Sequence, residues 1–212
     1  MVWRDRQQAG QKLAERLEKY RGKQKAVVLG LPRGGVVTAY QVARYLDLPL
    51  DIIVTRKIGA PDNEEYAIGA IDETGAGFFN DTAVQALGAG PGYLKETVRK
   101  EKKEAERRLR AYRAGRPPLD LTGATAIIVD DGVATGYTMR AALHSCRKKN
   151  AGRVIAAAPV IAPDTIPGLK ALADEVVCLE TPENFGGVGQ FYADFSPTTD
   201  EKVLSLLSQK KQ

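Results

Sequence analysis

The segment from Ile127 to Thr138 carries residue types with which proteins bind phosphorylated sugars. It contains a β-branched run, the adjacent carboxylates Asp130 and Asp131, a turn of small and hydroxyl residues, and then a helical pattern. A turn without bulky side chains lets backbone N–H groups approach a phosphate, and the N-terminus of the following helix favours the anion. Adjacent carboxylates at a strand end can accept hydrogen bonds from vicinal sugar hydroxyls. The alternative is an ordinary turn with a capping aspartate.

Two other segments place basic residues after predicted strands. Arg33-Gly34-Gly35 follows the first apolar run and precedes a helical pattern, so two glycine amides and a guanidinium could face an anion. Such a turn can also simply close a strand-helix connection. Arg56 and Lys57 end the second apolar run and precede Ile58-Gly59-Ala60-Pro61. These two cations either face an anion or form a solvated strand end.

Several functional classes do not fit the sequence. It has no Gly-x4-Gly-Lys-Ser/Thr motif and no Gly-x-Gly-x-x-Gly after a strand, which argues against Walker-type ATPases and Rossmann dehydrogenases. One histidine, His144, is too few for a metalloprotease motif. Cys146 and Cys178 lie among apolar neighbours and predict buried free thiols. The apolar runs are far shorter than the roughly 20 residues of a membrane helix.

The net charge of +5 is concentrated in one segment. Residues Lys95 to Arg116 include ten basic and four acidic side chains, a surplus of six, so the remainder is slightly acidic. Apolar side chains recur there at helical spacing, which indicates a solvated helix face rather than a nucleic-acid surface. A basic cluster near an anionic substrate is the other interpretation. The charged N-terminal stretch lacks an apolar signal segment, which predicts a cytoplasmic protein.

The elements that must position these residues alternate between strand and helix. The apolar runs that predict buried strands are Ala26–Leu29, Leu50–Thr55, Ala126–Val129, Val154–Ala158 and Val176–Leu179. Helical patterns occupy Val36–Leu46, Tyr137–Lys149 and Thr165–Ala173, and packing helices are predicted over Arg4–Tyr20 and around Val203–Leu207. This alternation predicts an α/β, doubly wound domain with a mainly parallel sheet flanked by helices, covering residues 1–212.

A long insert, residues 56–122, interrupts this alternation. It contains a predicted hairpin (67–71 with 77–79), the basic helix, and a polar stretch from Gly59 to Glu65 that predicts a mobile loop. Long loops beside the carboxyl edge of a sheet are often functional. We therefore expect this flexible loop to lie near the site.

The chain resembles the type I phosphoribosyltransferases, in which a buried strand is followed by two acidic residues and a Gly/Ala/Thr-rich turn. Arg33-Gly34-Gly35 resembles the pyrophosphate loop of that family, and Arg56-Lys57 resembles the start of its flexible loop. Together with Arg4-Asp5-Arg6 and the aromatic segment 185–195, these motifs look like the bacterial group of predicted phosphoribosyltransferases whose acceptor is unknown. The resemblance covers nearly the whole chain.

The resemblance implies a Mg2+-dependent glycosyltransferase that uses 5-phosphoribosyl 1-diphosphate (PRPP) and a nucleobase-like acceptor. It implies that Asp130, Asp131, Arg33 and Lys57 are catalytic, with the acidic pair contacting Mg2+ directly or through water. The other residues that it assigns to PRPP are Gly34, Gly35, Arg56, Gly132, Val133, Ala134, Thr135, Gly136, Tyr137 and Thr138. A small hood over residues 184–195 would bind the base, with Phe191 and Tyr192 as candidates. The other interpretation of this aromatic segment is a packed edge.

Two other functions fit the same motifs. A non-catalytic sensor would bind PRPP as an effector, although Arg33, Arg56 and Lys57 favour catalysis and no helix-turn-helix pair fits the N-terminus. A hydrolase of phosphorylated ribose compounds would use the same cradle. Dimers are common among similar enzymes, so a homodimer is an open alternative to a monomer, and no membrane or nucleic-acid partner is expected.

Overall fold

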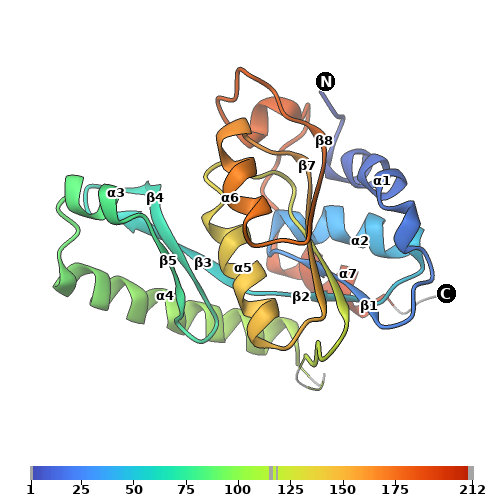
Figure 1. Cartoon of the computed structure of the whole chain (residues 1–212), viewed down its shortest axis with the longest axis horizontal. Helices are drawn as coiled ribbons and strands as arrows, with labels where there is room; N and C mark the ends of the chain where they lie inside the picture. Colours follow the sequence, from blue (N-terminus) through green and yellow to red (C-terminus); the bar gives the residue numbers. More distant parts are fainter. Residues whose placement is uncertain (1, 115–116, 118, 210–212) are drawn as a thin grey trace.

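The predicted strands form a parallel sheet in the computed structural model, which describes residues 2–114, 117 and 119–209 (Figure 1). In spatial order the strands of this sheet are β2 (Leu50–Ile52), β1 (Ala26–Gly30), β6 (Thr125–Val129), β7 (Arg153–Val160) and β8 (Glu175–Glu180). All adjacent pairs run parallel, as the alternation of strands and helices predicts.

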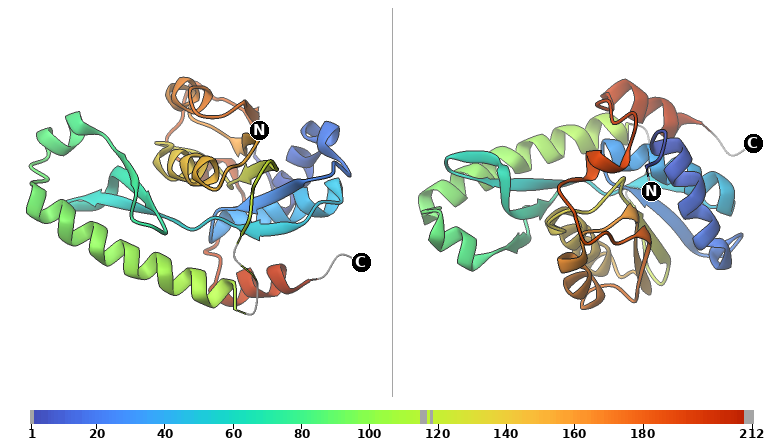
Figure 2. Two further views of the ribbon diagram at one scale, coloured as in Figure 1. Left: turned by 60° about the horizontal axis from the view of Figure 1, so that its bottom comes forward. Right: turned by 90° about the horizontal axis from the view of Figure 1, so that it is seen from above.

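Helices cover both faces of this sheet (Figure 2). They are α1 (Arg6–Arg16), α2 (Gly34–Leu46), α5 (Tyr137–Lys148) and α6 (Ile166–Lys170). Successive residues of a strand point to opposite faces. Accordingly, Ile127 and Val129 of β6 pack in the cluster under α1 and α2, whereas Ala126 and Ile128 pack in the cluster under α5 and α6. The domain is therefore doubly wound around a fully buried central strand.

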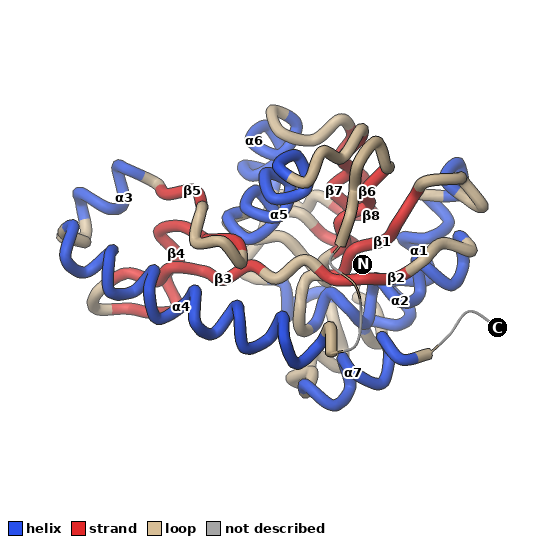
Figure 3. Tube along the Cα trace, turned by 90° about the horizontal axis from the view of Figure 1, so that it is seen from below, coloured by secondary structure: helices blue, strands red, loops and turns tan. Residues whose placement is uncertain are grey.

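The insert forms a second sheet beside α5. Its strands are β3 (Thr55–Ala60), β4 (Asn63–Asp72) and β5 (Gly77–Phe79), followed by α3 (Asp81–Ala86) and α4 (Pro91–Tyr112). The pairing of Gly69 with Phe79 and of Ile71 with Gly77 confirms the predicted hairpin. The long helix α4 runs along this sheet (Figure 3), where Ile58 and Ile68 are buried against its first turns.

Three sequence predictions differ from the structure. The run Leu50–Thr55 is not one strand, because β2 ends at Ile52 and Thr55 begins β3 in the other sheet. The stretch from Gly59 to Glu65 is not a mobile loop but the tight end of the β3–β4 hairpin. Strand β8 is half-buried rather than covered on both faces, because it is an edge strand. The last residues of the predicted basic helix, 115 and 116, lie outside the described part.

The N-terminal segment and the segment around residue 192 meet near the carboxyl edge of the parallel sheet. Trp3 pairs with Tyr192 in a short parallel bridge, and both side chains are buried in an aromatic cluster with Phe191. The remaining elements are α7 (Asp200–Ser208) and the short 3-10 turns η1 (Glu18–Tyr20), η2 (Pro163–Thr165) and η3 (Val188–Phe191). Within the described residues, no helix has the length and apolar character needed to cross a membrane.

Candidate functional site

The predicted site residues follow β1 and β6, which are neighbours in the middle of the parallel sheet. Gly30 pairs with Val129 at the carboxyl ends of these strands. From there the chain enters α2 on one face and α5 on the other, as the two hydrophobic clusters show. Where connections diverge to opposite faces, the strand ends leave a crevice in which α/β proteins bind ligands.

The acidic pair lies directly against the N-terminus of α2. A Cβ atom at Gly34 would overlap the carboxylate of Asp131, and one at Gly35 would lie 2.6 Å from Oδ1 of Asp130. Only glycine permits this approach, because any side chain would displace the carboxylates. The structure thus brings the predicted turn at residues 33–35 and the acidic pair together, although they are about 100 residues apart in sequence.

The two carboxylates have different environments. Burial, followed by the charge of Asp131, raises the pKa of the Asp130 carboxyl well above its usual range. Oδ1 of Asp130 also accepts a hydrogen bond from the backbone N–H of Asp131 at 2.9 Å. The Asp131 carboxylate instead forms an ion pair with Nε of Arg6 at 2.6 Å, and both side chains are largely buried. Of the two carboxyls, Asp131 is therefore the one already neutralised by a cation.

The turn from Gly132 to Thr138 is braced from the side of β7. Val133 pairs with Ile161, and the hydroxyl of Thr165 donates to the carbonyl of Ala134 at 2.5 Å. Gly136 has a φ of 75°, a conformation that favours glycine, and the turn leaves Ala134 and Thr135 exposed. The turn is thus fixed on its inner side and open on its outer side.

The helix N-termini at this crevice have no side-chain caps. Asp5, Asn80 and Thr199 each accept a backbone N–H at the start of α1, α3 and α7, respectively. Arg33 and Gly136 provide no such bond at the start of α2 and α5, and the starts of α4 and α6 also lack one. Uncapped N–H groups and the positive end of the helix dipole favour an anion. Two such ends, on either side of the acidic pair, suit a ligand with two phosphate groups.

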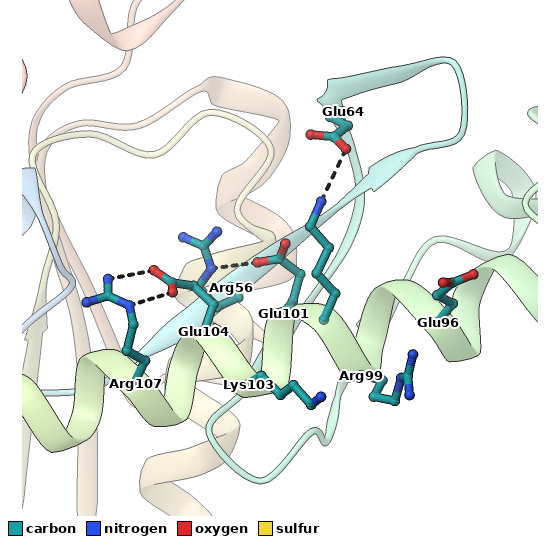
Figure 4. Close-up of a pocket in the computed structure, with 9 residues that line it drawn as sticks. Arg56, Glu64, Glu96, Arg99, Glu101, Lys103, Glu104 and Arg107 are labelled. Carbon is teal, nitrogen blue, oxygen red and sulfur yellow. Dashed lines mark hydrogen bonds and ion pairs between the residues drawn. The ribbon is translucent and has the colours of Figure 1, made fainter.

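The predicted cations are placed differently from one another. The Arg33 guanidinium is 43% exposed and lies 3.8 Å from the carboxylate of Asp200. Arg56 forms an ion pair with Glu101 of α4 at 2.7 Å (Figure 4). Among the described residues, no hydrogen bond or ion pair joins Arg56 to the acidic pair. Lys57 is the next strand residue and projects from the opposite face of β3. The two cations therefore lie on opposite faces of β3, and their contact with a bound anion stays a prediction.

The groove that contains Arg56 belongs to the insert. It has a volume of about 790 Å³ and lies along α4, with Lys100 reaching Glu64 of the β4 strand (Figure 4). Its lining is composed of acidic and basic side chains in comparable number, namely Arg56, Glu64, Glu96, Arg99, Lys100, Glu101, Lys103, Glu104 and Arg107. Ion pairs within the groove, such as Arg107 with Glu104 at 2.7 Å, neutralise much of this charge.

The segment predicted as a hood covers the acidic end of β6. A Cβ atom at Gly132 would overlap the side chain of Val188, and the Tyr192 hydroxyl donates to the carbonyl of Asp131 at 2.5 Å. Phe191 and Tyr192 are only 7% and 6% exposed. Burial, followed by the charge of Asp131, raises the pKa of the Tyr192 hydroxyl. These two aromatic side chains form a packed edge that holds the turn in place.

Arg6 is a site residue to which the sequence assigned no individual role. Besides Asp131, its guanidinium donates to the carbonyl of Ser196 at 2.9 Å and stacks over the Phe195 ring at 3.9 Å. It therefore connects the first helix, the acidic pair and the hood segment. Its membership of the Arg4-Asp5-Arg6 motif was the signal in the sequence, but its partners lie at least 125 positions further along the chain.

Comparison with known proteins identifies the family of the chain. A sequence model described as "Phosphoribosyl transferase domain" matches residues 3–196. The chain belongs to the family of proteins with this domain.

Particular relatives share most of the chain. Two Mycobacterium tuberculosis proteins, each named "Putative phosphoribosyl transferase", are 44% identical over 205 residues, which is 97% of this chain and 46% of theirs. The chain thus spans about half the length of these curated relatives. The crystal structure of TT1426 from Thermus thermophilus is similar with a TM-score of 0.80 and 43% identity, covering 98% of both chains.

Proposed function

We propose that this protein is a Mg2+-dependent phosphoribosyltransferase that transfers the 5-phosphoribosyl group from PRPP to a nitrogenous base and releases pyrophosphate. The observation that carries the proposal is the acidic pair flanked by two uncapped helix N-termini. The start of α2 would receive the pyrophosphate and the start of α5 the 5-phosphate. Asp130 and Asp131 would accept hydrogen bonds from the ribose hydroxyls between them.

The proposed reaction is a displacement at C1 of the ribose. The acceptor nitrogen donates its lone pair to C1 while the C1–O bond breaks, and pyrophosphate leaves with the bonding electrons. The proton of the acceptor nitrogen passes to solvent. The chain's own contribution is to fix both ends of PRPP and to place donors at the developing negative charge of the leaving group. Arg33 and Lys57 are our candidates for the cationic donors.

Arg33 can respond to the ligand because its present contact is weak. Its guanidinium is separated from Asp200 by 3.8 Å and is partly exposed, an arrangement worth little in water. Pyrophosphate bound at the α2 N-terminus would offer a more highly charged acceptor beside Gly34. Arg33 would then exchange its carboxylate partner for the leaving group.

The donor set fits Mg2+. Carboxylate oxygens suit this hard cation, which retains several waters and needs few protein ligands when a phosphate is present. Asp130 is the better candidate because Arg6 already neutralises Asp131. In the described residues, no group of three or more His, Cys, Asp or Glu side chains could hold a metal. The pyrophosphate oxygens would therefore supply most ligands, and Mg2+ would neutralise charge on the leaving group.

Calorimetric titration with PRPP in Mg2+, with ribose 5-phosphate as the comparison ligand, tests the proposal. We expect saturable binding of PRPP that is tighter than binding of ribose 5-phosphate, and release of pyrophosphate when the correct base is added. Binding without pyrophosphate release across a panel of bases would favour a sensor, and ribose 5-phosphate formation without an acceptor would favour a hydrolase. Absence of PRPP binding by folded protein would refute the proposal.

A further inference from the structure

Arg140, in the first turn of α5, has no polar partner in the described part of the chain. Its Nε atom is buried without a hydrogen-bond acceptor. No ion pair or side-chain hydrogen bond from a described residue reaches its guanidinium. Buried polar atoms in proteins are nearly always bonded, and an unpartnered one needs an explanation. The side chain as a whole is partly exposed, so a bound anion would meet the guanidinium from its exposed side.

The surroundings of Arg140 are shaped to hold its guanidinium at the end of the Gly132–Thr138 turn. A side chain at Gly168 of α6 would overlap its Nη2 atom, so the planar group lies directly against that glycine. On the other side, Nε lies 3.7 Å from the position that a Cβ atom would occupy on Gly136. The Tyr137 ring lies 5.8 Å away. The guanidinium is thus fixed between α6 and the turn.

The Arg140 side chain extends toward the N-terminus of α5, where the positive end of the helix dipole also lies. Side chains on a helix lean toward its N-terminus, so Arg140 extends back toward Gly136 and the uncapped amides of α5. Arg147, on the same helix, has a different environment and forms an ion pair with Asp174 at 2.8 Å. Of these two arginines, the one beside the turn is left without a carboxylate from the described residues.

We propose that Arg140 binds the terminal phosphate monoester of a phosphorylated ribose held by the Gly132–Thr138 turn. The inference rests on the proposed function, because it concerns the same ligand. A phosphate monoester is largely dianionic at neutral pH, with a second pKa of about 6. Backbone amides and a helix dipole supply only partial charges, whereas a guanidinium supplies a full charge and directed donors. Arg140 would thereby select the phosphorylated sugar over the free sugar.

The competing explanation is that Arg140 only packs between the two helices. A packing role and a ligand role predict different results for the ligand-free protein. If the guanidinium only packs, its removal lowers the stability of the free protein. If it awaits an anion, its removal costs the free protein little, because no hydrogen bond is lost, and instead reduces the stabilisation that the ligand provides.

The test compares Arg140→Gln, Arg140→Lys and the matched helix variant Arg147→Gln with the wild type. Each protein is titrated calorimetrically with ribose 5-phosphate, with PRPP and with Mg2+-pyrophosphate, and its melting temperature is measured with and without each ligand. For Arg140→Gln we expect affinity for ribose 5-phosphate and PRPP to fall about 10- to 100-fold, and affinity for pyrophosphate to change less than about 2-fold. Arg140→Lys should retain an intermediate affinity, and Arg147→Gln should retain wild-type affinity.

The outcomes separate this inference from the proposed function. If the wild type binds PRPP and Arg140→Gln binds all three ligands equally well, the role of Arg140 is refuted while the proposed function stands. An equal loss for all three ligands, or a large drop in the melting temperature of ligand-free Arg140→Gln, would also refute it in favour of packing. If the wild type binds neither ribose 5-phosphate nor PRPP, both proposals are refuted.

Discussion

At the scale of single residues, the adjacent carboxylates lower the stability of the folded protein. The pKa of Asp130 is raised by burial and by Asp131, so its ionised form is less favourable in the folded than in the unfolded chain. This loss of stability is absent below about pH 3.9, the pKa of an aspartate in the unfolded chain. It becomes complete as the pH rises through the pKa of Asp130 in the folded protein. A cation or a set of ribose hydroxyls would relieve it.

Asp130→Asn should therefore stabilise the free protein and impair the site. At pH 7 we expect the free energy of unfolding to rise, with the gain vanishing near pH 4. The asparagine oxygen can still accept the N–H of Asp131. PRPP affinity should fall by about 1–3 kcal/mol. Urea unfolding at several pH values and calorimetry measure these effects.

Asp51→Asn is the control for this prediction, because it weakens an ion pair with Arg113 and should destabilise the protein. A destabilised Asp130→Asn would contradict the account.

Gly34→Ala tests the close approach of α2 to the acidic pair. The added methyl group would overlap the Asp131 carboxylate and come within 2.8 Å of Nε of Arg6. We expect a loss of about 1–3 kcal/mol of stability and a marked loss of pyrophosphate affinity. Gly92→Ala is the control, because a Cβ atom there has open space within a helix and should be neutral or stabilising. Thermal unfolding that is equal for the two variants would argue against the tight contact.

The sequence correctly placed candidate residues at strand ends where one short segment contained both the strand and those residues. Asp130 directly follows β6, and Gly34 comes four residues after the end of β1. The ion pair between Arg6 and Asp131 spans 125 positions and has no local signature. Arg140 was also missed, because an unpartnered guanidinium is visible only once its neighbours are known.

At the scale of elements, the insert shows that an apolar run predicts a strand but not the sheet to which the strand belongs. Leu50–Thr55 is continuously strand-like, but the chain leaves the parallel sheet after Ile52 and starts the antiparallel one at Thr55. Hydrophobicity does not report which neighbour a strand pairs with. Arg56 consequently belongs to a strand packed under α4 rather than to a loop at the site, and its charge is matched by Glu101.

Glu101→Gln should loosen the insert by leaving Arg56 without its carboxylate. The two side chains are 24% and 13% exposed, so the pair is shielded enough for its loss to cost about 1–3 kcal/mol. Arg56→Gln should cost a similar amount, and the double variant should cost less than the sum of the two. Chemical denaturation measures this cycle, with exposed Glu96→Gln as the control. Full additivity would show that the pair contributes nothing.

At the scale of the whole molecule, the insert is attached to the parallel domain on two sides. On the α5 side, Nδ2 of Asn80 donates to the hydroxyl of Tyr137 at 2.9 Å, and Lys149 pairs with Glu73 at 3.0 Å. On the α4 side, the Tyr112 hydroxyl donates to Asp200 at 2.6 Å. Asp200 also lies near Arg33 of the α2 turn. Tyr137 on one side and Asp200 on the other thus connect the insert to residues of, or next to, the proposed PRPP site.

This arrangement predicts that a ligand at the turn before α5 rigidifies the insert. Tyr137 belongs to that turn, and its partner Asn80 both caps α3 and follows β5. We expect saturating PRPP to slow amide hydrogen exchange in β4 and β5. Tyr137→Phe should reduce this protection while changing PRPP affinity less than about 5-fold, because one neutral hydrogen bond contributes about 1 kcal/mol.

Tyr93→Phe provides the matched control for this coupling. Its hydroxyl donates to the carbonyl of Gly59 at 3.0 Å, entirely within the insert, so its loss should raise exchange there with and without ligand alike. Hydrogen-exchange mass spectrometry of the three proteins distinguishes the two patterns. If PRPP protects β4 and β5 equally in Tyr137→Phe and in the wild type, the Asn80–Tyr137 bond does not carry the coupling. The Lys149–Glu73 ion pair and the α4 attachment through Asp200 and Arg33 would then be the remaining routes, and Asp200→Asn would be expected to reduce the protection instead.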